Sequence, residues 1–307
     1  MDDNRRSYDK AEKTFLDAEG LDPTPKMIHL DRLDSDVRVL DVGAGPPVLF
    51  IPGTMTGAAG FARLVSRMPS YRCIMIDRPG VGLSPQLPKP PITLQDHHQT
   101  ADHLLADVLD GLDIDQSHIV STSLGGWSAF RSMAARPDRF LRSVGIAFQV
   151  GARIETAPLS MRMPAVPPLT PRRVRISPWL LRTMLKSSGM RSAIEGGTFS
   201  DEMIDWMVAL FRYTPTFRND SLHAPRPVGL AGPITEVQHP TELLANVDSP
   251  VHLFWGTDDI FGGQPTAKEF AALLPRATLQ MVPGVGHAPW IEKPDLCAKA
   301  VLDHLAG

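Results

Sequence analysis

Cysteine is scarce in this chain, since only Cys73 and Cys297 occur among its 307 residues. Cys73 falls in an expected core strand and Cys297 in an expected terminal helix, so we expect two buried thiols and no disulfide framework. The chain also lacks a large excess of charge of either sign: its net charge is −3 at pH 7, and lysine and arginine form no dense run. A protein with this charge pattern is not expected to bind nucleic acid.

Long apolar segments are absent as well. The N-terminal segment up to Gly20 is strongly charged and lacks the apolar core of a signal peptide, and no later run has the length of a membrane span. These absences favour a cytoplasmic protein. The sequence also lacks a metal-binding motif. His97, His98 and His103 lie along one expected helix, but no cysteine or carboxylate residues follow the spacing of a metal site. We therefore expect no metal and no cofactor.

The composition, with 43% hydrophobic and 21% charged residues, is typical of a globular domain with a sizeable core. Apolar runs of strand length alternate with segments whose apolar residues recur at helical spacing. The expected strands are residues 27–30, 37–42, 48–51, 73–76, 118–120, 141–148, 251–255 and 278–282, and the expected helices include residues 61–68, 94–112, 266–274 and 295–305. This order predicts the α/β class, with a mostly parallel twisted sheet flanked by helices.

Two parts of the chain stand apart from this alternation. The residues before Gly20 are expected to form a polar helix or a frayed arm without a chemical role. From 149 to 237 the chain is rich in proline, methionine and arginine, with helical patches around 178–186 and 201–211. We expect this second stretch to be a mainly helical cap, inserted after the sixth strand into a core domain formed by residues 1–148 and 238–307.

Ser123 lies between an expected buried strand and an expected helix, in the segment Ser121-Thr122-Ser123-Leu124-Gly125-Gly126. A sharp strand–turn–helix connection requires small residues two positions before and after its central serine, and the positions of Ser121 and Gly125 meet this requirement. Such a turn exposes the serine hydroxyl. Ser123 is therefore a candidate nucleophile, and Ser121 is expected to pack within the turn.

A serine hydroxyl becomes a useful nucleophile only beside a base that is held in place by an acid. His287 follows the last expected strand in a loop of glycine and proline residues, and it is the expected base. Asp259 follows residues 251–255 and is the expected acid, because it resembles the acid usually found at the third position after the glycine of such a loop, here Gly256; Asp258 is its competitor. Both loops leave the carboxyl edge of the sheet, where ligands bind in open α/β folds.

Taken together, five motifs resemble those of the α/β-hydrolase fold serine hydrolases. They are GPPVLFIPG at 45–53, DRPGVGLS at 77–84, the Ser123 turn, GTDD at 256–259, and GHAPWIEKP at 286–294. The resemblance implies that the backbone N–H groups of Thr54 and Leu124 bind the oxyanion of the reaction. The chain departs from the family pattern at Pro52, where histidine is usual, and at Ser121, where glycine is usual.

The resemblance also implies cofactor-free hydrolysis of a hydrophobic small-molecule ester, with water as co-substrate and an acyl-enzyme formed on Ser123. Two alternatives stay open: hydrolysis of a carbon–carbon bond beside a ketone by the same three residues, and a non-hydrolytic ligand receptor on the same fold. Apolar side chains near the Ser123 turn and in the cap are expected to line the substrate pocket. They are Met55, Trp127, Trp179, Met184, Trp206, Phe211 and Trp290.

Overall fold

An eight-stranded sheet with the order β1-β2-β4-β3-β5-β6-β9-β10 runs through the computed structural model, which describes residues 3–155, 175–229 and 231–307. The strands are β1 Thr24–Leu30, β2 Ser35–Val42, β3 Pro47–Ile51, β4 Arg72–Ile76, β5 Ser117–Thr122, β6 Phe140–Ile146, β9 Val251–Gly256 and β10 Ala277–Val282. β2 runs antiparallel to both of its neighbours, and every other pair is parallel. The expected mostly parallel sheet is confirmed.

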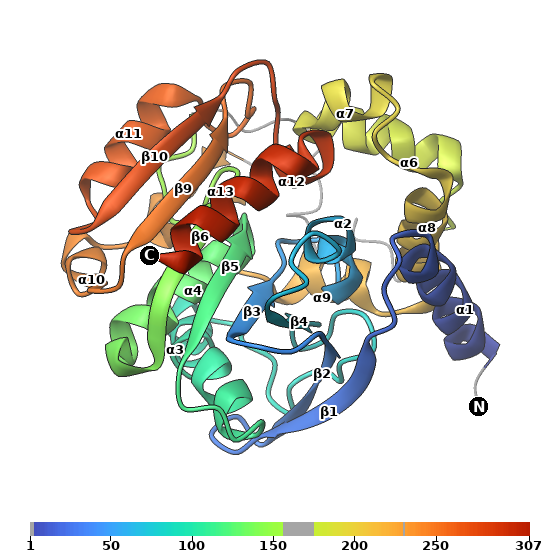
Figure 1. Cartoon of the computed structure of the whole chain (residues 1–307), viewed down its shortest axis with the longest axis horizontal. Coiled ribbons are helices and arrows are strands. Elements are labelled where there is room, and N and C mark those ends of the chain that lie inside the picture. Colours follow the sequence, from blue (N-terminus) through green and yellow to red (C-terminus); the bar gives the residue numbers. More distant parts are fainter. Residues whose placement is uncertain (1–2, 156–174, 230) are drawn as a thin grey trace.

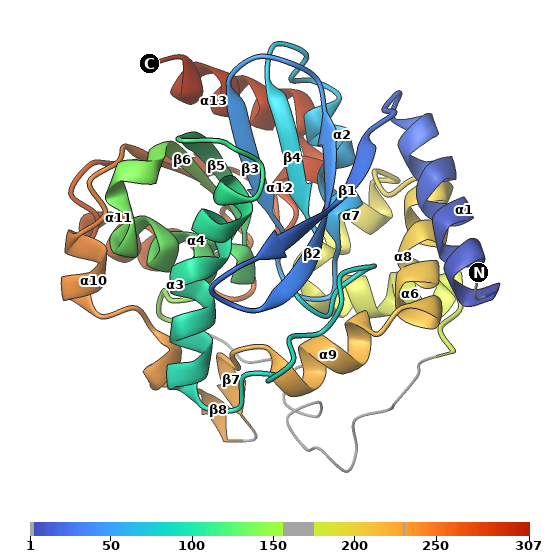
Figure 2. The ribbon, with the colours of Figure 1, turned by 90° about the horizontal axis from the view of Figure 1, so that it is seen from below.

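Helices cover both faces of this sheet (Figure 1 and Figure 2). Alternate residues of β3 show why: Val48 and Phe50 belong to one buried core, whereas Leu49 and Ile51 belong to the other. The core that contains Val48 also contains residues of four helices: α1 Asp3–Ala18, α2 Ala62–Val65, α12 Pro289–Glu292 and α13 Pro294–Ala306. The core on the other face contains residues of α3 Leu94–Asp110, α4 Leu124–Ala135, α10 Thr241–Ala245 and α11 Gln264–Ala272. A strand buried on both sides is apolar at every position, which explains the continuous runs in the sequence.

Most of the expected boundaries differ from the structure by a few residues, and two of these differences have a clear physical form. β6 ends at Ile146 and not at Phe148, because Ala147 adopts a left-handed φ of 64° and the Phe148 N–H turns away to the Asp259 carboxylate. The helix expected over 61–68 is shorter, with a 3₁₀ turn at Ala58–Phe61 followed by α2. The first difference matters for function, since it brings the end of β6 to the carboxylate of a candidate acid.

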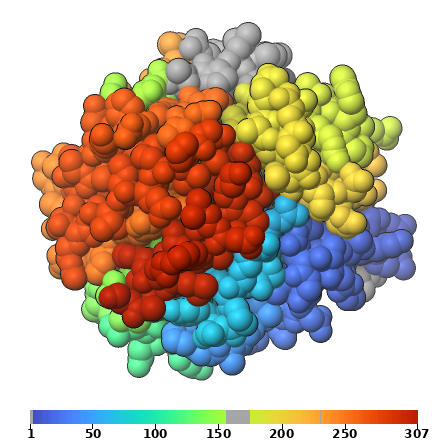
Figure 3. Space-filling model, turned by 45° about the horizontal axis from the view of Figure 1, so that its top comes forward, coloured from blue at the N-terminus to red at the C-terminus, as the bar shows by residue number. Residues whose placement is uncertain are grey.

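The described residues between β6 and β9 form mainly short helices. They are α6 Pro178–Leu185, a π turn at Lys186–Met190, α7 Arg191–Glu195, α8 Asp201–Tyr213 and α9 Thr216–His223, followed by the small pair β7 Val228–Gly229 and β8 Gly232–Pro233. On the face shown in Figure 3, the yellow residues of this segment adjoin both the blue N-terminal and the orange-red C-terminal parts of the chain. Part of the expected cap, residues 156–174, lies outside the described residues.

The N-terminal segment is a helix with one buried face. Tyr8, Glu12, Phe15 and Leu16 of α1 recur at helical spacing and are all buried. α1 lies alongside α8 in both ribbon views (Figure 1 and Figure 2), and the rings of Phe15 and Trp206 stack with centroids 5.3 Å apart. The segment is thus part of the core and not a frayed arm.

Cys73 on β4 and Cys297 on α13 are free, buried thiols, as expected. Burial raises the pKa of Cys73 to about 12, so this thiol stays protonated at neutral pH. None of the helices in the described ranges is long and apolar enough to cross a bilayer.

The buried imidazole of His239 should make the free energy of unfolding depend on pH. It stacks on Trp127 and meets the edge of Phe130, and burial lowers the pKa of His239 to about 3. Between this value and the unfolded pKa near 6.5, only the unfolded chain binds the proton, so stability is lost as the pH falls. We expect His239→Gln to reduce the slope of unfolding free energy against pH by about 1.4 kcal/mol per unit between pH 6 and 4.

Urea denaturation at several pH values measures this slope. His29→Gln is the control, because the exposed His29 hydrogen-bonds Asp36, which raises its pKa, and it is therefore protonated in both states below pH 6. A slope that is the same in wild type and in His239→Gln would show that His239 is not buried in its neutral form.

Candidate active site

Ser123 stands at a sharp turn between β5 and α4, with φ of 50° and ψ of −116°. Glycine is required beside it because other parts of the chain approach closely. A Cβ at Gly125 would lie 2.1 Å from the Ile51 carbonyl oxygen, and one at Gly126 would lie 1.7 Å from Oε1 of Gln149. Ser121 is buried, and its hydroxyl donates to the same Gln149 oxygen at 3.3 Å, which fits the expected packing role. The turn therefore holds Ser123 in a conformation that few residues adopt.

Asp259 and His287 form a buried pair at the carboxyl edge of the sheet. Nδ1 of His287 lies 2.7 Å from Oδ2 of Asp259, and the two residues are only 6% and 5% exposed. The carboxylate also accepts the backbone N–H groups of Phe148 at 2.9 Å and Phe261 at 3.1 Å. Three hydrogen bonds thus fix the acid, and the acid leaves Nε2 of His287 as the free nitrogen of the ring.

Two further contacts hold the His287 ring and its loop. The Phe261 ring meets the imidazole edge to face with centroids 4.7 Å apart, and the His287 N–H donates to the Gly189 carbonyl at 2.9 Å. Gly189 lies between α6 and α7, so the inserted segment contacts the histidine loop directly. Asp258, in contrast, is exposed and accepts the Thr257 hydroxyl at 2.7 Å. The structure therefore pairs His287 with Asp259 and not with Asp258.

Ser123 and His287 line one cavity of about 300 Å³. The backbone positions expected to bind an oxyanion, Thr54 and Leu124, line it as well. Leu124 is the first residue of α4, where the backbone N–H has no acceptor within the helix. The cavity therefore brings together the candidate nucleophile, the candidate base and the two expected N–H groups.

The loop after β3 is held by hydrogen bonds from residues that the sequence analysis did not identify as part of the site. Arg78 donates from Nη2 to the Gly53 carbonyl at 2.9 Å and to Oδ2 of Asp220 at 2.8 Å, and the same Asp220 oxygen accepts the Met55 N–H at 2.6 Å. Asp220 belongs to α9 in the inserted segment, far from Arg78 in the sequence. Arg78 stands in the motif at 77–84, but no local pattern marks Asp220 as its partner.

Five of the seven expected pocket residues line the main cavity: Met55, Met184, Trp206, Phe211 and Trp290. Trp127 and Trp179 do not. The Trp127 indole belongs to the core on the opposite face of the sheet, where Nε1 donates to the Val237 carbonyl at 3.0 Å. Trp179 is 75% exposed, because α6 turns Leu181 and Leu185 inward and residue 179 lies on another side of the helix.

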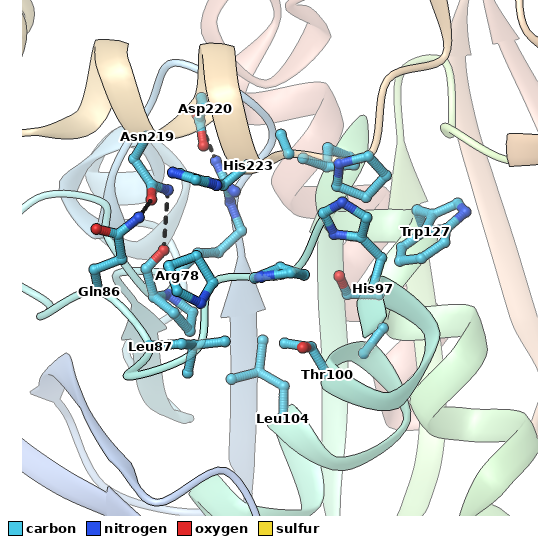
Figure 4. Close-up of a pocket in the computed structure, with 18 residues that line it drawn as sticks. Arg78, Gln86, Leu87, His97, Thr100, Leu104, Trp127, Asn219, Asp220 and His223 are labelled. Carbon is cyan, nitrogen blue, oxygen red and sulfur yellow. Dashed lines mark hydrogen bonds and ion pairs between the residues drawn. The ribbon is translucent and has the colours of Figure 1, made fainter. Parts of the chain in front are cut away.

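Trp127 instead lines a second cavity of about 70 Å³ (Figure 4). Leu124 and Asp220 line both cavities, so the Arg78–Asp220 pair lies where the two spaces adjoin. His97 faces this smaller space, and burial lowers its pKa to about 4. Across the ranges that the structure describes, no group of three or more histidine, cysteine or carboxylate residues is arranged to hold a metal ion.

A parallel α/β sheet, a serine on a strand–turn–helix connection and a His–Asp pair at the same edge are the features of the α/β-hydrolase class. The alpha/beta hydrolase family matches residues 48–300 of the chain, and the protein belongs to this family.

Known relatives are similar over most of the chain. A 2-hydroxy-6-oxononadienedioate/2-hydroxy-6-oxononatrienedioate hydrolase of Cupriavidus pinatubonensis is 24% identical over 284 residues, which cover 87% of this chain and 90% of the relative. A carboxylesterase of Bacillus subtilis has a TM-score of 0.71 at 17% identity, with 99% of both chains covered. A 2-hydroxy-6-oxo-6-phenylhexa-2,4-dienoate hydrolase of Rhodococcus sp. strain RHA1 has a TM-score of 0.74 at 18% identity, with 93% of this chain and 99% of the other covered. The solved structures show a common fold.

The Arg78–Asp220 pair predicts the outcome of Asp220→Asn. The substitution keeps an oxygen for the Met55 N–H but leaves the Arg78 guanidinium buried without its counter-charge. Breaking a buried ion pair from one side costs about 3 kcal/mol or more. We expect a loss of that size in the free energy of unfolding, measured by urea denaturation. The control is Asp205→Asn on α8, an exposed carboxylate, which should change the value by less than about 0.5 kcal/mol.

Proposed function

We propose that this protein is a cofactor-free serine hydrolase that cleaves carboxylic esters carrying an apolar group. The observation that carries the proposal is the single cavity shared by Ser123, on its strained turn, and His287, hydrogen-bonded to Asp259. A nucleophile, a base and an acid that holds the base are the parts needed for acyl transfer.

In this mechanism Oγ of Ser123 attacks the ester carbonyl carbon while Nε2 of His287 takes the hydroxyl proton. Asp259 stabilises the resulting imidazolium through Nδ1. The backbone N–H groups of Thr54 and Leu124 donate to the oxyanion of the tetrahedral intermediate. The proton then passes from His287 to the departing alkoxide, which leaves acyl-Ser123. Water attacks this ester with His287 again as base, and the carboxylic acid is released.

The walls of the cavity support an apolar substrate. Methionine supplies much of the surface, through Met184, Met190, Met203 and Met207, and aromatic rings supply more, through Phe148, Phe199, Phe211, Phe217, Trp206 and Trp290. Flexible thioether side chains adapt to irregular apolar shapes. Arg226 is the only arginine or lysine among the described residues that line the cavity. A substrate with two carboxylates, such as a dienedioate, would bury one of them without a counter-charge, which is costly.

The inserted segment supports the expected division into domains. Residues of α6, α8 and α9 form a large part of the cavity wall, whereas Ser123, Asp259 and His287 come from loops of the core sheet. We therefore infer that residues 149–237 act as a cap that shapes the substrate site, over a core domain of residues 1–148 and 238–307.

Carbon–carbon bond hydrolysis is the second candidate, and Arg226 favours it. Burial lowers the pKa of Arg226, and a substrate carrying one carboxylate beside a ketone would stabilise its charge. Relatives whose names describe dienoate and dienedioate hydrolases make this class of substrate relevant. The same serine, histidine and aspartate would serve, since the step again begins with attack on a carbonyl carbon.

Ser123→Ala tests the nucleophile. We expect it to abolish labelling by a serine-reactive fluorophosphonate and to lower kcat on nitrophenyl esters by about a millionfold, as the loss of the serine does in comparable triads. Labelling of wild type without turnover of short or long nitrophenyl esters would favour the carbon–carbon candidate, tested next with an aryl diketone acid. No labelling of folded wild type would overturn the hydrolase proposal in favour of a ligand receptor.

Asp259→Asn tests the acid. The amide keeps the size of the side chain but no longer selects the histidine tautomer that accepts the serine proton, so kcat should fall about ten-thousandfold. Asp258→Asn is the matched control on the neighbouring exposed residue, and its kcat should stay within about twofold of wild type. Equal losses in the two variants would contradict the assignment of Asp259. Both are measured by steady-state hydrolysis of the better nitrophenyl ester.

A further inference from the structure

We propose that helix α1 sets the substrate preference of the site, because Tyr8 and Phe15 hold the pocket residue Trp206 in one position. This inference rests on the proposed hydrolase function and extends it to residues that do not touch the substrate. Trp206 lines the main cavity, whereas Tyr8 and Phe15 lie behind it and are fully buried. They are therefore candidate positioning residues.

The Trp206 side chain is held by α1 in two ways. Its Nε1 donates to the Tyr8 hydroxyl at 3.3 Å, and its ring stacks on Phe15 with an interplanar angle of 23°. The first contact fixes the direction of the indole, and the second fixes its plane. Burying an indole N–H without an acceptor costs free energy. The Trp206 ring is therefore most stable in the position where its N–H reaches the Tyr8 hydroxyl.

Tyr8 is itself fixed by a buried charged network. Its hydroxyl donates to Oε1 of Glu12 at 2.8 Å, and Nη1 of Arg38 donates to the same oxygen at 3.1 Å. Arg38 lies on β2 and also donates to Oδ2 of Asp77 at 3.1 Å. Glu12, Arg38 and Asp77 are each less than 9% exposed. Helix α1 is thereby anchored to the sheet and not only to the cap.

The same network reaches the loop that carries the oxyanion site. Oδ1 of Asp77 accepts the Ala58 N–H at 2.8 Å, four positions after Thr54. A Cβ at Gly60 would lie 3.6 Å from the Trp206 ring, so that loop and the indole are in contact range. Trp206 is thus positioned relative to the reacting carbonyl by a continuous path: α8 to α1, α1 to β2, and β2 to the loop after β3.

This arrangement has a consequence for selectivity. Trp206 lies on α8 in the wall of the same cavity as Ser123, so we expect a long substrate chain to contact the indole and a short one to end before it. Loosening the indole should therefore impair reaction with long chains more than with short ones. Displacement of a pocket group far from the chemistry can lower rates by up to about a hundredfold.

The experiment compares how fast an ethyl and an octyl fluorophosphonate label Ser123, which needs no knowledge of the natural substrate. We expect Tyr8→Phe to lower the octyl-to-ethyl ratio of second-order rate constants about fivefold, and Phe15→Leu to lower it in the same direction. Tyr71→Phe is the matched control: it removes the same hydroxyl at a position outside the cavity lining and should leave the ratio unchanged.

A double mutant separates positioning from general loosening of the fold. In a Trp206→Phe background there is no indole N–H for Tyr8 to hold, so adding Tyr8→Phe should change the ratio by less than about twofold. Unchanged ratios in Tyr8→Phe and Phe15→Leu, or an equal fall in Tyr71→Phe, would overturn the role of α1 while the hydrolase proposal stands. Absence of labelling in wild type would overturn both.

Discussion

Two adjacent buried residues of opposite charge, Asp77 and Arg78, hold the loop on which the site depends. Arg78 donates to the carbonyl of Gly53 at one end of this loop, and Asp77 accepts the N–H of Ala58 further along it. Each then pairs with a different partner, Asp77 with Arg38 of the sheet and Arg78 with Asp220 of the inserted segment. The loop between them carries Thr54, so its position relative to Ser123 is set by both the sheet and the inserted segment. A buried charge is tolerated only when it is paired, which makes these links difficult to loosen singly.

Much of the fold was readable from the sequence because its signals are local. Strands buried on both faces are continuous apolar runs, and their alternation with helical periodicity gave the parallel sheet. The Ser123 turn was readable for the same reason: its requirement for small neighbours is met by residues two positions away. The preference for Asp259 over Asp258 needed the resemblance to a family, because both carboxylates lie in one loop and nothing local distinguishes them. The structure then separates them by burial and by the contact with His287.

What the sequence did not show depends on contacts between distant segments. Arg78 and Asp220 are 142 positions apart, and Tyr8 and Trp206 are 198 apart, so neither pair leaves a local pattern. The buried face of α1 was hidden because Glu12, a residue type usually exposed, occupies one of its inward positions. The placement of Trp127 failed for another reason. The sequence places Trp127, a large apolar residue, close to the Ser123 turn. It does not show which way the side chain points, because that direction is set by how α4 packs on the sheet.

The site therefore separates into two physical parts, which meet at a few residues of the cavity wall. Paired charges and backbone hydrogen bonds hold the loop after β3, and in the proposed mechanism this loop positions the reacting carbonyl. Methionine and aromatic side chains of the inserted segment line the cavity, and in the proposed function they select which substrate shapes fit. Substitutions among those apolar residues can change substrate range without disturbing the charged links. Trp206 belongs to both parts, because it lines the cavity while its N–H is linked, through Tyr8 and Glu12, to the buried charged residues. Under the proposed function, a change at this position should affect both substrate range and the geometry of reaction, since the Trp206 side chain connects the two parts of the site.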